Sequence, residues 1–280
     1  MVFLFRLISY LPLPWLHALG GLIGRLVYLL SSTYRRNLRA NVAQAGIDLQ
    51  LCTQIAAETG KQMLELARIW MYPLDVAVRQ VVDVRGLALV EAARAEGKGI
   101  VFLTPHLGCF EITAQFLSTL GDITVLYRPP KFAAGQELIL MGRKRQHLHL
   151  APADLSGVRT LIKALKKGQM VGMLPDQAPK TGEGVWLKFF DRYAYTMTLA
   201  ARLTETGAVA LLTWGERLPG GQGYRIHFQA PMTPLQGGTV ERAQQINHEI
   251  ETLIRSCPSQ YLWGYNRYKR PAGAEPPPAT

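Results

Sequence analysis

A histidine and a glutamate stand five positions apart in TPHLGCFEI, where His106 is followed by Glu111. An imidazole can take a proton from a hydroxyl group, while a carboxylate on its other nitrogen fixes the tautomer and stabilises the imidazolium that forms. The spacing alone is common, because six histidines and 20 acidic residues in 280 positions give about 0.4 such pairs by chance. The alternative is a structural hydrogen bond at a strand end.

A second pair with the same spacing, His149 and Asp154, lies in HLAPAD, so the context has to separate the two. His106 follows the apolar run GIVFL, which predicts a buried strand, and Glu111 begins an amphipathic helical pattern. Both side chains then lie at a strand end, where open α/β sheets bind ligands. The second pair has Pro152 between its members, and we predict that His149 and Asp154 lie in a loop.

The elements that must position His106 alternate between helix and strand. Apolar runs predict strands at 99–104, 122–128, 170–175, 208–217 and 224–230, and helical spacing predicts helices at 48–71, 110–121, 133–147, 156–168, 195–207 and 240–256. This alternation predicts an α/β fold with a mixed sheet flanked by helices. We expect one domain over 32–270, after an N-terminal segment at 1–31 and before a disordered proline-rich tail at 271–280.

The chain carries a net charge of +11, from 31 Lys and Arg against 20 Asp and Glu, which favours an anionic partner. The basic residues are scattered among apolar helices without a nucleic-acid-binding motif, so we expect no nucleic acid partner. Cys52, Cys109 and Cys257 form no CxxC pair, which argues against a zinc knuckle or a disulfide framework and fits a reducing, cytosol-facing environment. For Cys109 we expect a packing role.

The N-terminal segment at 1–31 is mostly apolar and has no small-residue cleavage site. Its apolar run is interrupted by Arg6, Pro12, Pro14, His17 and Arg25. Leucines gather on one side of 16–30, and the polar or small residues gather on the other. Three interpretations remain: a kinked spanning helix, a buried helix of the domain, and an in-plane helix. The last would be held against anionic headgroups by Arg25, Arg35, Arg36 and Arg39. In either membrane arrangement the positive charge that follows predicts a cytoplasmic domain.

Several blocks occur in order along the chain: TPHLGCFE, VLYRPPK, MGRKR, the stretch 157–190, TLAARLTETGA and PSQYLWGYNRYKR. Together they resemble the late acyltransferases of lipid A biosynthesis, the lauroyl or myristoyl transferases of Gram-negative inner membranes, within the histidine-x4-acid acyltransferase superfamily. The resemblance implies a glycerolphosphate-acyltransferase-like fold, an acyl carrier protein as donor and a phosphorylated glycolipid of the Kdo-lipid IVA type as acceptor. It also implies the cytoplasmic face of the inner membrane, and no cofactor or metal ion.

The resemblance also assigns roles to residues. His106 matches the general base, Glu111 the carboxylate of the relay, and Arg143 the active-site arginine, with Arg145 as a neighbour that could be confused with it. The other candidate substrate-binding residues lie in the YRP and LPDQ blocks and in the basic helical stretch that begins at 157. They are Tyr127, Arg128, Arg159, Asp176 and Gln177.

When the resemblance is set aside, the residues alone also allow other roles for these candidates. Arg143 could lie on a solvated basic helix face instead of binding phosphate through two hydrogen bonds. Asp176 could cap a turn. The basic side of 156–168 could face lipid headgroups or an acidic partner, and YLWGYNRYK could lie at a membrane interface or pack against the domain.

The chain has no GxSxG motif, so a histidine and a carboxylate without a serine nucleophile predict direct acyl transfer. We expect His106 to activate the hydroxyl of a 3-hydroxyacyl chain on the acceptor, and that hydroxyl to attack the acyl thioester. The same pair would serve a lysophospholipid or another glycolipid. A non-catalytic membrane-binding protein is the rival from another class. A metal site at His106, Glu111, His147 and His149 is a further alternative, which activity in the presence of a chelator would eliminate.

Overall fold

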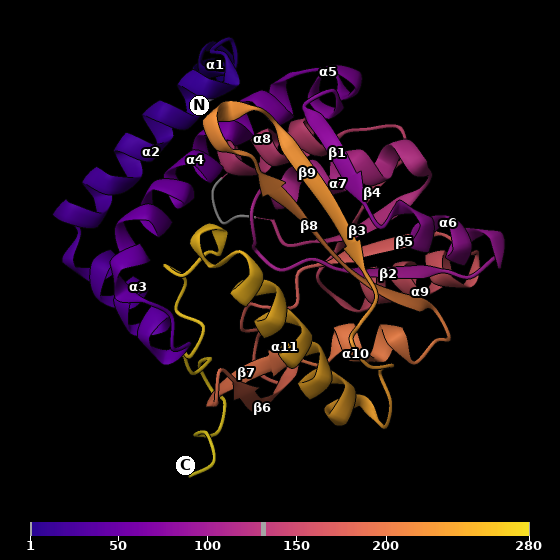
Figure 1. Ribbon diagram of the computed structural model, residues 1–280. Coiled ribbons are helices and arrows are strands. Elements are labelled where there is room, and N and C mark those ends of the chain that lie inside the picture. The colour runs from indigo at the N-terminus through magenta and orange to yellow at the C-terminus, as the bar shows by residue number, and fades with distance from the viewer. Residues whose placement is uncertain (1, 130–132, 280) are drawn as a thin grey trace.

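A seven-stranded mixed sheet forms the centre of the computed structural model, which describes residues 2–129 and 133–279 (Figure 1). The strand order is β1-β9-β8-β2-β5-β3-β4. The strands are β1 (Val81–Arg85), β2 (Ile100–Leu103), β3 (Ile123–Tyr127), β4 (Leu148–Pro152), β5 (Met170–Met173), β8 (Val209–Arg217) and β9 (Tyr224–Gln229). All neighbouring strands are parallel except β8 and β9, so the predicted mixed sheet in an α/β fold is confirmed.

The central strands are buried on both faces, as expected of parallel strands covered by helices. Successive side chains of β2 point to opposite faces: Val101 and Leu103 join one hydrophobic core, and Ile100 and Phe102 join the other. Each core is completed by helices on its face of the sheet. From residue 74 onward, the helices are α5 (Leu74–Val78), α6 (Leu87–Ala95), α7 (Phe110–Leu120), α8 (Ala133–Arg143), α9 (Leu155–Lys166), α10 (Leu199–Thr204) and α11 (Thr239–Ser256).

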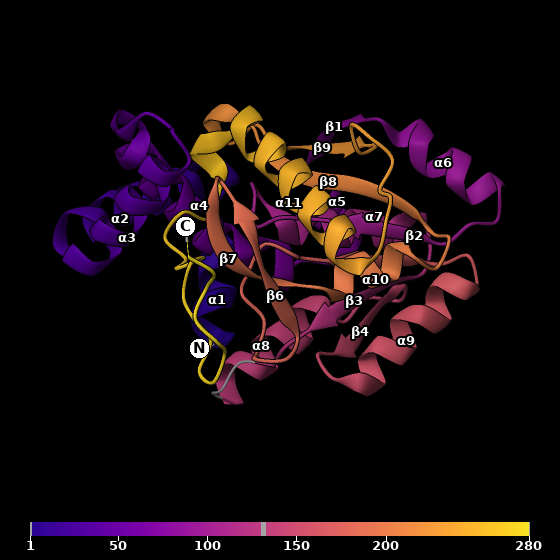
Figure 2. The ribbon, with the colours of Figure 1, turned by 90° about the horizontal axis from the view of Figure 1, so that it is seen from below.

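Four helices come before α5 in the chain: α1 (Val2–Ser9), α2 (Leu13–Leu30), α3 (Ser32–Gln44) and, after a short 3-10 turn at Leu49–Leu51, α4 (Cys52–Met71). Asp48 caps the start of this turn by accepting a hydrogen bond from the backbone N–H of Gln50. Helix α2 lies along α4 at the edge of the molecule (Figures 1 and 2). Among the described residues, α2 is the one helix that could cross a membrane when only its length and its apolar composition are considered.

Glycines bring α2 and α4 into backbone contact. A Cβ atom at Gly24 would lie 2.0 Å from the carbonyl oxygen of Ala56, and one at Gly60 would lie 2.0 Å from that of Gly20. The buried side of α2 is therefore made of small and polar residues together with Leu13, Leu16 and Tyr28. The large apolar side chains point outward, and those exposed on α2 are Trp15, Leu19, Leu22, Ile23, Leu26, Val27, Leu29 and Leu30.

Several parts of the fold differ from the sequence prediction. Helices α3, α5 and α6 and strands β1, β4 and β6 (Gly184–Phe189) were not predicted. His149 lies in strand β4, not in a loop. Asp154 lies between β4 and α9, as predicted, and caps α9 by accepting hydrogen bonds from the N–H groups of residues 156 and 157. Residues 195–197 belong to β7 (Arg192–Met197), which pairs with β6 (Gly184–Phe189), although we predicted a helix over 195–207. Aromatic and β-branched residues in YAYTM favour a strand there, and the helix is confined to α10.

The proline-rich tail begins with contacts to the β6–β7 region. The Trp186 Nε1 group donates a hydrogen bond to the carbonyl of Glu275 (3.0 Å), and the Thr181 hydroxyl donates one to that of Ala272 (2.6 Å). Ala274 is buried. These contacts hold residues 272–275 against the domain, and disorder stays a prediction for the rest of the tail.

Candidate active site

His106 lies directly beyond β2, and its closest carboxylate comes from the end of the neighbouring strand β5. The His106 Nδ1 atom lies 2.9 Å from Oδ1 of Asp176, and the backbone N–H of His106 donates to Oδ2 of the same carboxylate (3.0 Å). Asp176 is buried. Burial alone would raise the pKa of Asp176, but the charge of His106 and these hydrogen bonds hold the pKa below its usual value. A buried carboxylate thus fixes both the backbone and the ring of His106.

This contact determines the tautomer of His106. An ionised carboxylate only accepts hydrogen bonds, so Nδ1 carries the proton and Nε2 presents a lone pair. The Gln177 Nε2 group lies 3.2 Å from that nitrogen, and the ring of Phe110 packs edge-on against the imidazole, 4.9 Å between centroids. An unprotonated Nε2 with its lone pair is the feature that a general base needs.

Glu111 lies in the first turn of α7 and contacts a cation. Both of its oxygens accept hydrogen bonds from the Arg143 guanidinium, and Oε2 also accepts one from Nε1 of Trp70 (2.9 Å). Burial would raise the pKa of Glu111, but the positive charge of Arg143 and the hydrogen bonds lower it below its usual value. The partner charge of Glu111 likewise outweighs burial and raises the pKa of Arg143. The two form a buried ion pair beside the histidine.

A cavity of about 240 Å³ opens at this edge of the sheet. It combines a polar end at His106, Gln177 and Arg143 with apolar walls. Its lining residues are His106, Phe110, Leu126, Tyr127, Arg128, Ile139, Arg143, Ala153, Leu174, Gln177, Ala178, Pro179 and Met197. The buried Tyr127 hydroxyl has no hydrogen-bond partner within the described part of the chain. A cavity that combines apolar walls with a few polar groups suits a ligand with both apolar and polar parts.

Comparison with known proteins gives a family match. Residues 1–270 match the family described as bacterial lipid A biosynthesis acyltransferase. The chain belongs to this family. It is 27% identical to the lipid A biosynthesis palmitoleoyltransferase of Escherichia coli (strain K12), over 94% of this chain and 88% of the relative. It is 25% identical to the lauroyltransferase of the same strain, over 95% and 90%, and 24% identical to a lipid A biosynthesis acyltransferase of Haemophilus influenzae, over 94% and 84%.

In the site of this lipid A acyltransferase, one contact differs from the prediction. The sequence predicted that Glu111 holds the second nitrogen of His106, and the structure places Asp176 there. The side chain of Glu111 turns toward α4 and α8, where Trp70 and Arg143 hold it. A role for Glu111 in the reaction stays a prediction. The Asp176 contact joins residues 70 positions apart, and no local spacing in the sequence indicates it.

The remaining candidates divide between the cavity and the surface. Tyr127 and Gln177 line the cavity, as does Arg128, which is exposed and lies 3.5 Å from the carboxylate of Glu183. The last two residues of the VLYRPPK block lie outside the described residues. Arg159 is exposed on α9 and is not among the residues that line the cavity. Arg145 serves the fold, because its guanidinium bonds to the carbonyls of residues 69 and 72 and to Gln115.

In this lipid A acyltransferase, His147 and His149 lie at the other end of the parallel strands from His106. Nδ1 of His147 and Nε2 of His149 lie 2.9 and 3.1 Å from one oxygen of Asp122, which precedes β3. His106 follows a strand that runs parallel to β3, so the two groups are separated by the length of the strands. The structure thus separates His147 and His149 from His106 and Glu111, and the described residues contain no cluster suited to a metal ion. Cys109 is buried, and burial raises the pKa of its thiol.

Proposed function

We propose that this lipid A acyltransferase transfers a fatty acyl chain from acyl carrier protein to a 3-hydroxyacyl chain of a lipid A precursor of the Kdo-lipid IVA type, with His106 as general base. The observation that carries the proposal is the His106–Asp176 pair at the rim of a largely apolar cavity, with Nε2 of His106 on the side of Gln177. A lysophospholipid acceptor would need the same base, so the acceptor is inferred from the family.

The reaction needs two proton transfers at Nε2 of His106. The acceptor hydroxyl replaces the Gln177 amide at this nitrogen and gives up its proton as its oxygen attacks the thioester carbonyl. When the tetrahedral intermediate collapses, the carbon–sulfur bond breaks, and the imidazolium returns the proton to the departing thiolate of the carrier. Asp176 keeps Nδ1 protonated throughout and stabilises the imidazolium between the two steps.

Arg143 and Tyr127 are the groups proposed to meet the charged parts of the substrates. Glu111 bonds to Nε and Nη2 of Arg143, and Nη1 bonds to none of the residues that the structure describes, so Nη1 can bind a phosphate or the oxyanion of the intermediate. The Tyr127 hydroxyl, which also lacks a partner among those residues, can donate to the same ligand. In this proposal Glu111 acts by holding Arg143 in place, and its relay role passes to Asp176.

The outward face of α2 supports a position at the membrane surface. Because α2 packs along α4 over its length, its apolar side chains can enter the bilayer interface while the helix stays parallel to it. Arg25, Arg36 and Arg39 are exposed on α2 and α3, where they can meet anionic headgroups. We therefore favour the in-plane arrangement, with the domain on the cytoplasmic face of the inner membrane.

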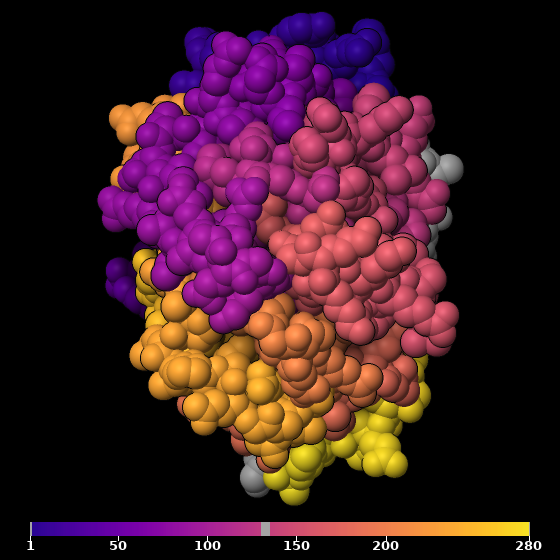
Figure 3. Space-filling view, turned by 90° about the vertical axis from the view of Figure 1, so that its right-hand side faces the viewer, coloured from indigo at the N-terminus to yellow at the C-terminus, as the bar shows by residue number. Residues whose placement is uncertain are grey.

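The basic side of α9 supports a soluble acidic donor. Arg159, Lys163, Lys166 and Lys167 are exposed, and α9 lies on the side of the molecule turned away from α2 and α3 (Figures 1 and 3). A membrane that meets α2 would therefore leave the basic side of α9 free. We propose that it attracts the carrier protein by charge, which acts mainly on the association rate.

Mass spectrometry of lipid A tests the proposal in one experiment. Cells that lack the gene would be complemented with the wild type, with His106→Ala, and with His149→Ala as the matched control in the other histidine pair. We expect the wild type and His149→Ala to restore one secondary acyl chain, and His106→Ala to restore none because the base is lost.

Two outcomes would contradict the proposal. A non-catalytic membrane-binding protein predicts that His106→Ala restores lipid A as well as the wild type does. A different acceptor predicts unchanged lipid A in the deletion strain and a change among phospholipids or other glycolipids. Immunoblotting of each variant in the membrane fraction would show that the proteins are present at equal levels.

A further inference from the structure

The backbone of the His106 segment is held between two other parts of the chain. On one side, the N–H of Cys109 donates to the carbonyl of Gly215 in β8 (2.7 Å). On the other side, the N–H of Gly108 donates to the carbonyl of Gln260 (3.0 Å), and the carbonyl of His106 accepts from the N–H of Leu262 (3.1 Å). Residues 106–109 thus form a short middle segment between the end of β8 and residues 260–262.

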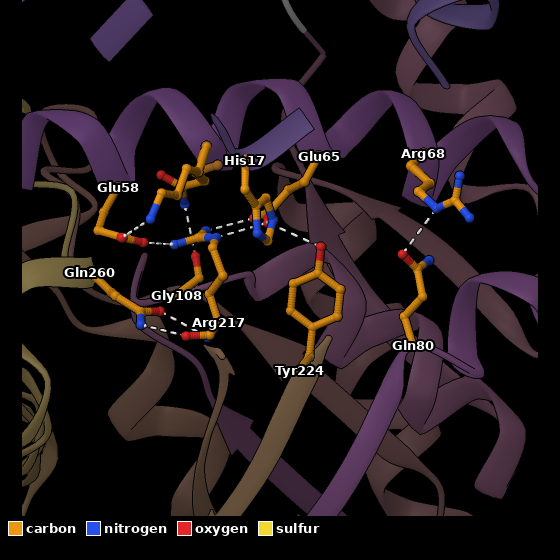
Figure 4. Close-up of polar contacts among 11 residues, drawn as sticks. His17, Glu58, Glu65, Arg68, Gln80, Gly108, Arg217, Tyr224 and Gln260 are labelled. Carbon is orange, nitrogen blue, oxygen red and sulfur yellow. Dashed lines mark hydrogen bonds and ion pairs between the residues drawn. The ribbon is translucent and has the colours of Figure 1, made fainter. Parts of the chain in front are cut away.

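The side chain of Gln260 joins the two outer segments to each other. Its Oε1 accepts from the backbone N–H of Arg217 (2.9 Å), and its Nε2 donates to the carbonyl of the same residue (2.9 Å) (Figure 4). This amide uses both backbone groups of Arg217, as a neighbouring strand would. The side chain therefore sets the position of its own carbonyl, which is the one that receives the Gly108 N–H.

Arg217, the partner of Gln260, is itself held in place by buried hydrogen bonds. Its guanidinium is fully buried and bonds to both oxygens of Glu65 (2.8 and 2.6 Å) and to Glu58 (2.7 Å) (Figure 4). From α4, the Gln62 side chain also donates to the carbonyl of Gly108 (3.2 Å). Every backbone polar group at Gly108 is thereby tied to a buried part of the protein.

Gly108 lets this close arrangement form. Its φ is +60°, and a Cβ atom there would lie 2.0 Å from the carbonyl oxygen of Gly215. A side chain at this position would push the His106 segment away from β8. The segment is thus packed tightly against β8, while its other edge depends on the position of Gln260.

We infer that Gln260 is a positioning residue for His106. The inference rests on the proposed function, in which Nε2 of His106 must meet both the acceptor hydroxyl and the leaving thiolate. Without the side-chain amide, the 260–262 segment can shift relative to β8 and carry the carbonyl that holds Gly108 with it. Small displacements of a catalytic group reduce the chemical step far more than they reduce binding. PSQYLWGYNRYKR thus has a part in the site, beyond the membrane-interface or packing interpretations of its aromatic residues.

Gln260→Ala and Gln244→Ala form a matched pair for the test. The side chain of Gln244 also accepts from one backbone N–H and donates to the carbonyl of the same residue, Lys188 (2.9 and 3.0 Å), and both glutamines are partly buried. Lys188 lies in β6 and does not line the cavity. Each variant loses two hydrogen bonds between a side-chain amide and one backbone residue, and we expect both variants to have a Tm a few degrees lower than the wild type.

Hydrogen exchange and kinetics on the full-length protein in detergent separate a positioning role from a structural one. We expect faster amide exchange in the peptide spanning 104–112 for Gln260→Ala and unchanged exchange there for Gln244→Ala. With an acyl carrier protein thioester and a phosphorylated glucosamine glycolipid, we expect kcat of Gln260→Ala to fall about tenfold or more while KM changes less than about threefold. We expect Gln244→Ala to keep the wild-type kcat.

Any other result would contradict a specific part of the proposal. Unchanged exchange at 104–112 in Gln260→Ala, or the same increase in Gln244→Ala, removes the proposed link between Gln260 and the His106 segment. Faster exchange with unchanged kcat shows that the link exists but does not position the base. If the wild type transfers no acyl chain, or if His106→Ala keeps wild-type activity, the proposed function fails instead, and the exchange data still report on the link.

Discussion

The imidazole of His106 takes its orientation from a carboxylate that no local motif contains. The sequence pointed to the base through the apolar strand before it, and to Glu111 through spacing. Asp176 entered the prediction only as a residue of the LPDQ block at another strand end. Its contact with Nδ1 arises because β5 pairs with β2. Strand order is a property of the whole sheet, and a single sequence does not state it.

Replacing each carboxylate by its amide distinguishes the roles of Asp176 and Glu111. In Asp176→Asn, the amide can donate to Nδ1 and favour the tautomer that carries its proton on Nε2, so we expect kcat to fall about 100-fold or more. In Glu111→Gln, the base keeps its tautomer, but Arg143 loses its buried counter-charge. We therefore expect a smaller loss of kcat, accompanied by a loss of stability of about 3 kcal/mol.

Steady-state kinetics and thermal unfolding of both variants check this assignment. Asp122→Asn, which changes the carboxylate of the other histidine group, is the control for loss of a histidine-bonded acid away from the cavity. The assignment is wrong if Glu111→Gln loses as much kcat as Asp176→Asn while its Tm matches the wild type. That result would return the relay role to Glu111.

Among the elements, α2 shows most directly what a sequence pattern leaves open. The apolar and polar sides were evident from the residues, but not which of them faces the protein. The structure buries the side with glycines and His17, because small residues allow α2 and α4 to approach closely and His17 finds a partner in Glu65 (3.0 Å). The short strands β1 and β4 were missed for a related reason: neighbouring strands stabilise them more than their own residues do.

Alanine at two glycines of α2 tests the packing against α4. At Gly21, a Cβ atom would meet the Lys61 and Ala57 side chains at ordinary distances, 3.5 and 3.8 Å, so we expect Gly21→Ala to be neutral or to stabilise the helix by up to about 1 kcal/mol. At Gly24, the Cβ would overlap the carbonyl of Ala56, and we expect Gly24→Ala to destabilise the protein by about 1–3 kcal/mol.

Urea unfolding in detergent measures both effects, and flotation with vesicles of anionic lipid reports on membrane binding. We expect both variants to bind vesicles at low urea, because the apolar side of α2 is unchanged. Equal stability of the two variants would show that the close contact at Gly24 is not part of the native packing.

At the scale of the whole molecule, one buried group of charges joins the N-terminal helices to the sheet. Glu65 of α4 accepts hydrogen bonds from Arg217 of β8 and Tyr224 of β9 and contacts His17 of α2 (Figure 4). Burial would raise the pKa of Glu65, but the Arg217 charge and the hydrogen bonds lower it to about 2. One ionised carboxylate therefore links α2 and α4 to the sheet.

This network predicts how the stability changes in acid. The pKa of Glu65 falls from an ordinary 4.5 to about 2 on folding, so its contribution is complete above pH 4.5 and is lost as the pH falls toward 2. The shift corresponds to about 3 kcal/mol. We expect the difference in unfolding free energy between the wild type and Glu65→Gln to shrink by about this amount from pH 5 to pH 2, measured by urea unfolding in detergent. Glu91→Gln, at an exposed position of α6, should differ little from the wild type at either pH. A Glu65→Gln difference that does not change with pH would mean that Glu65 is not held ionised by Arg217 in the folded protein.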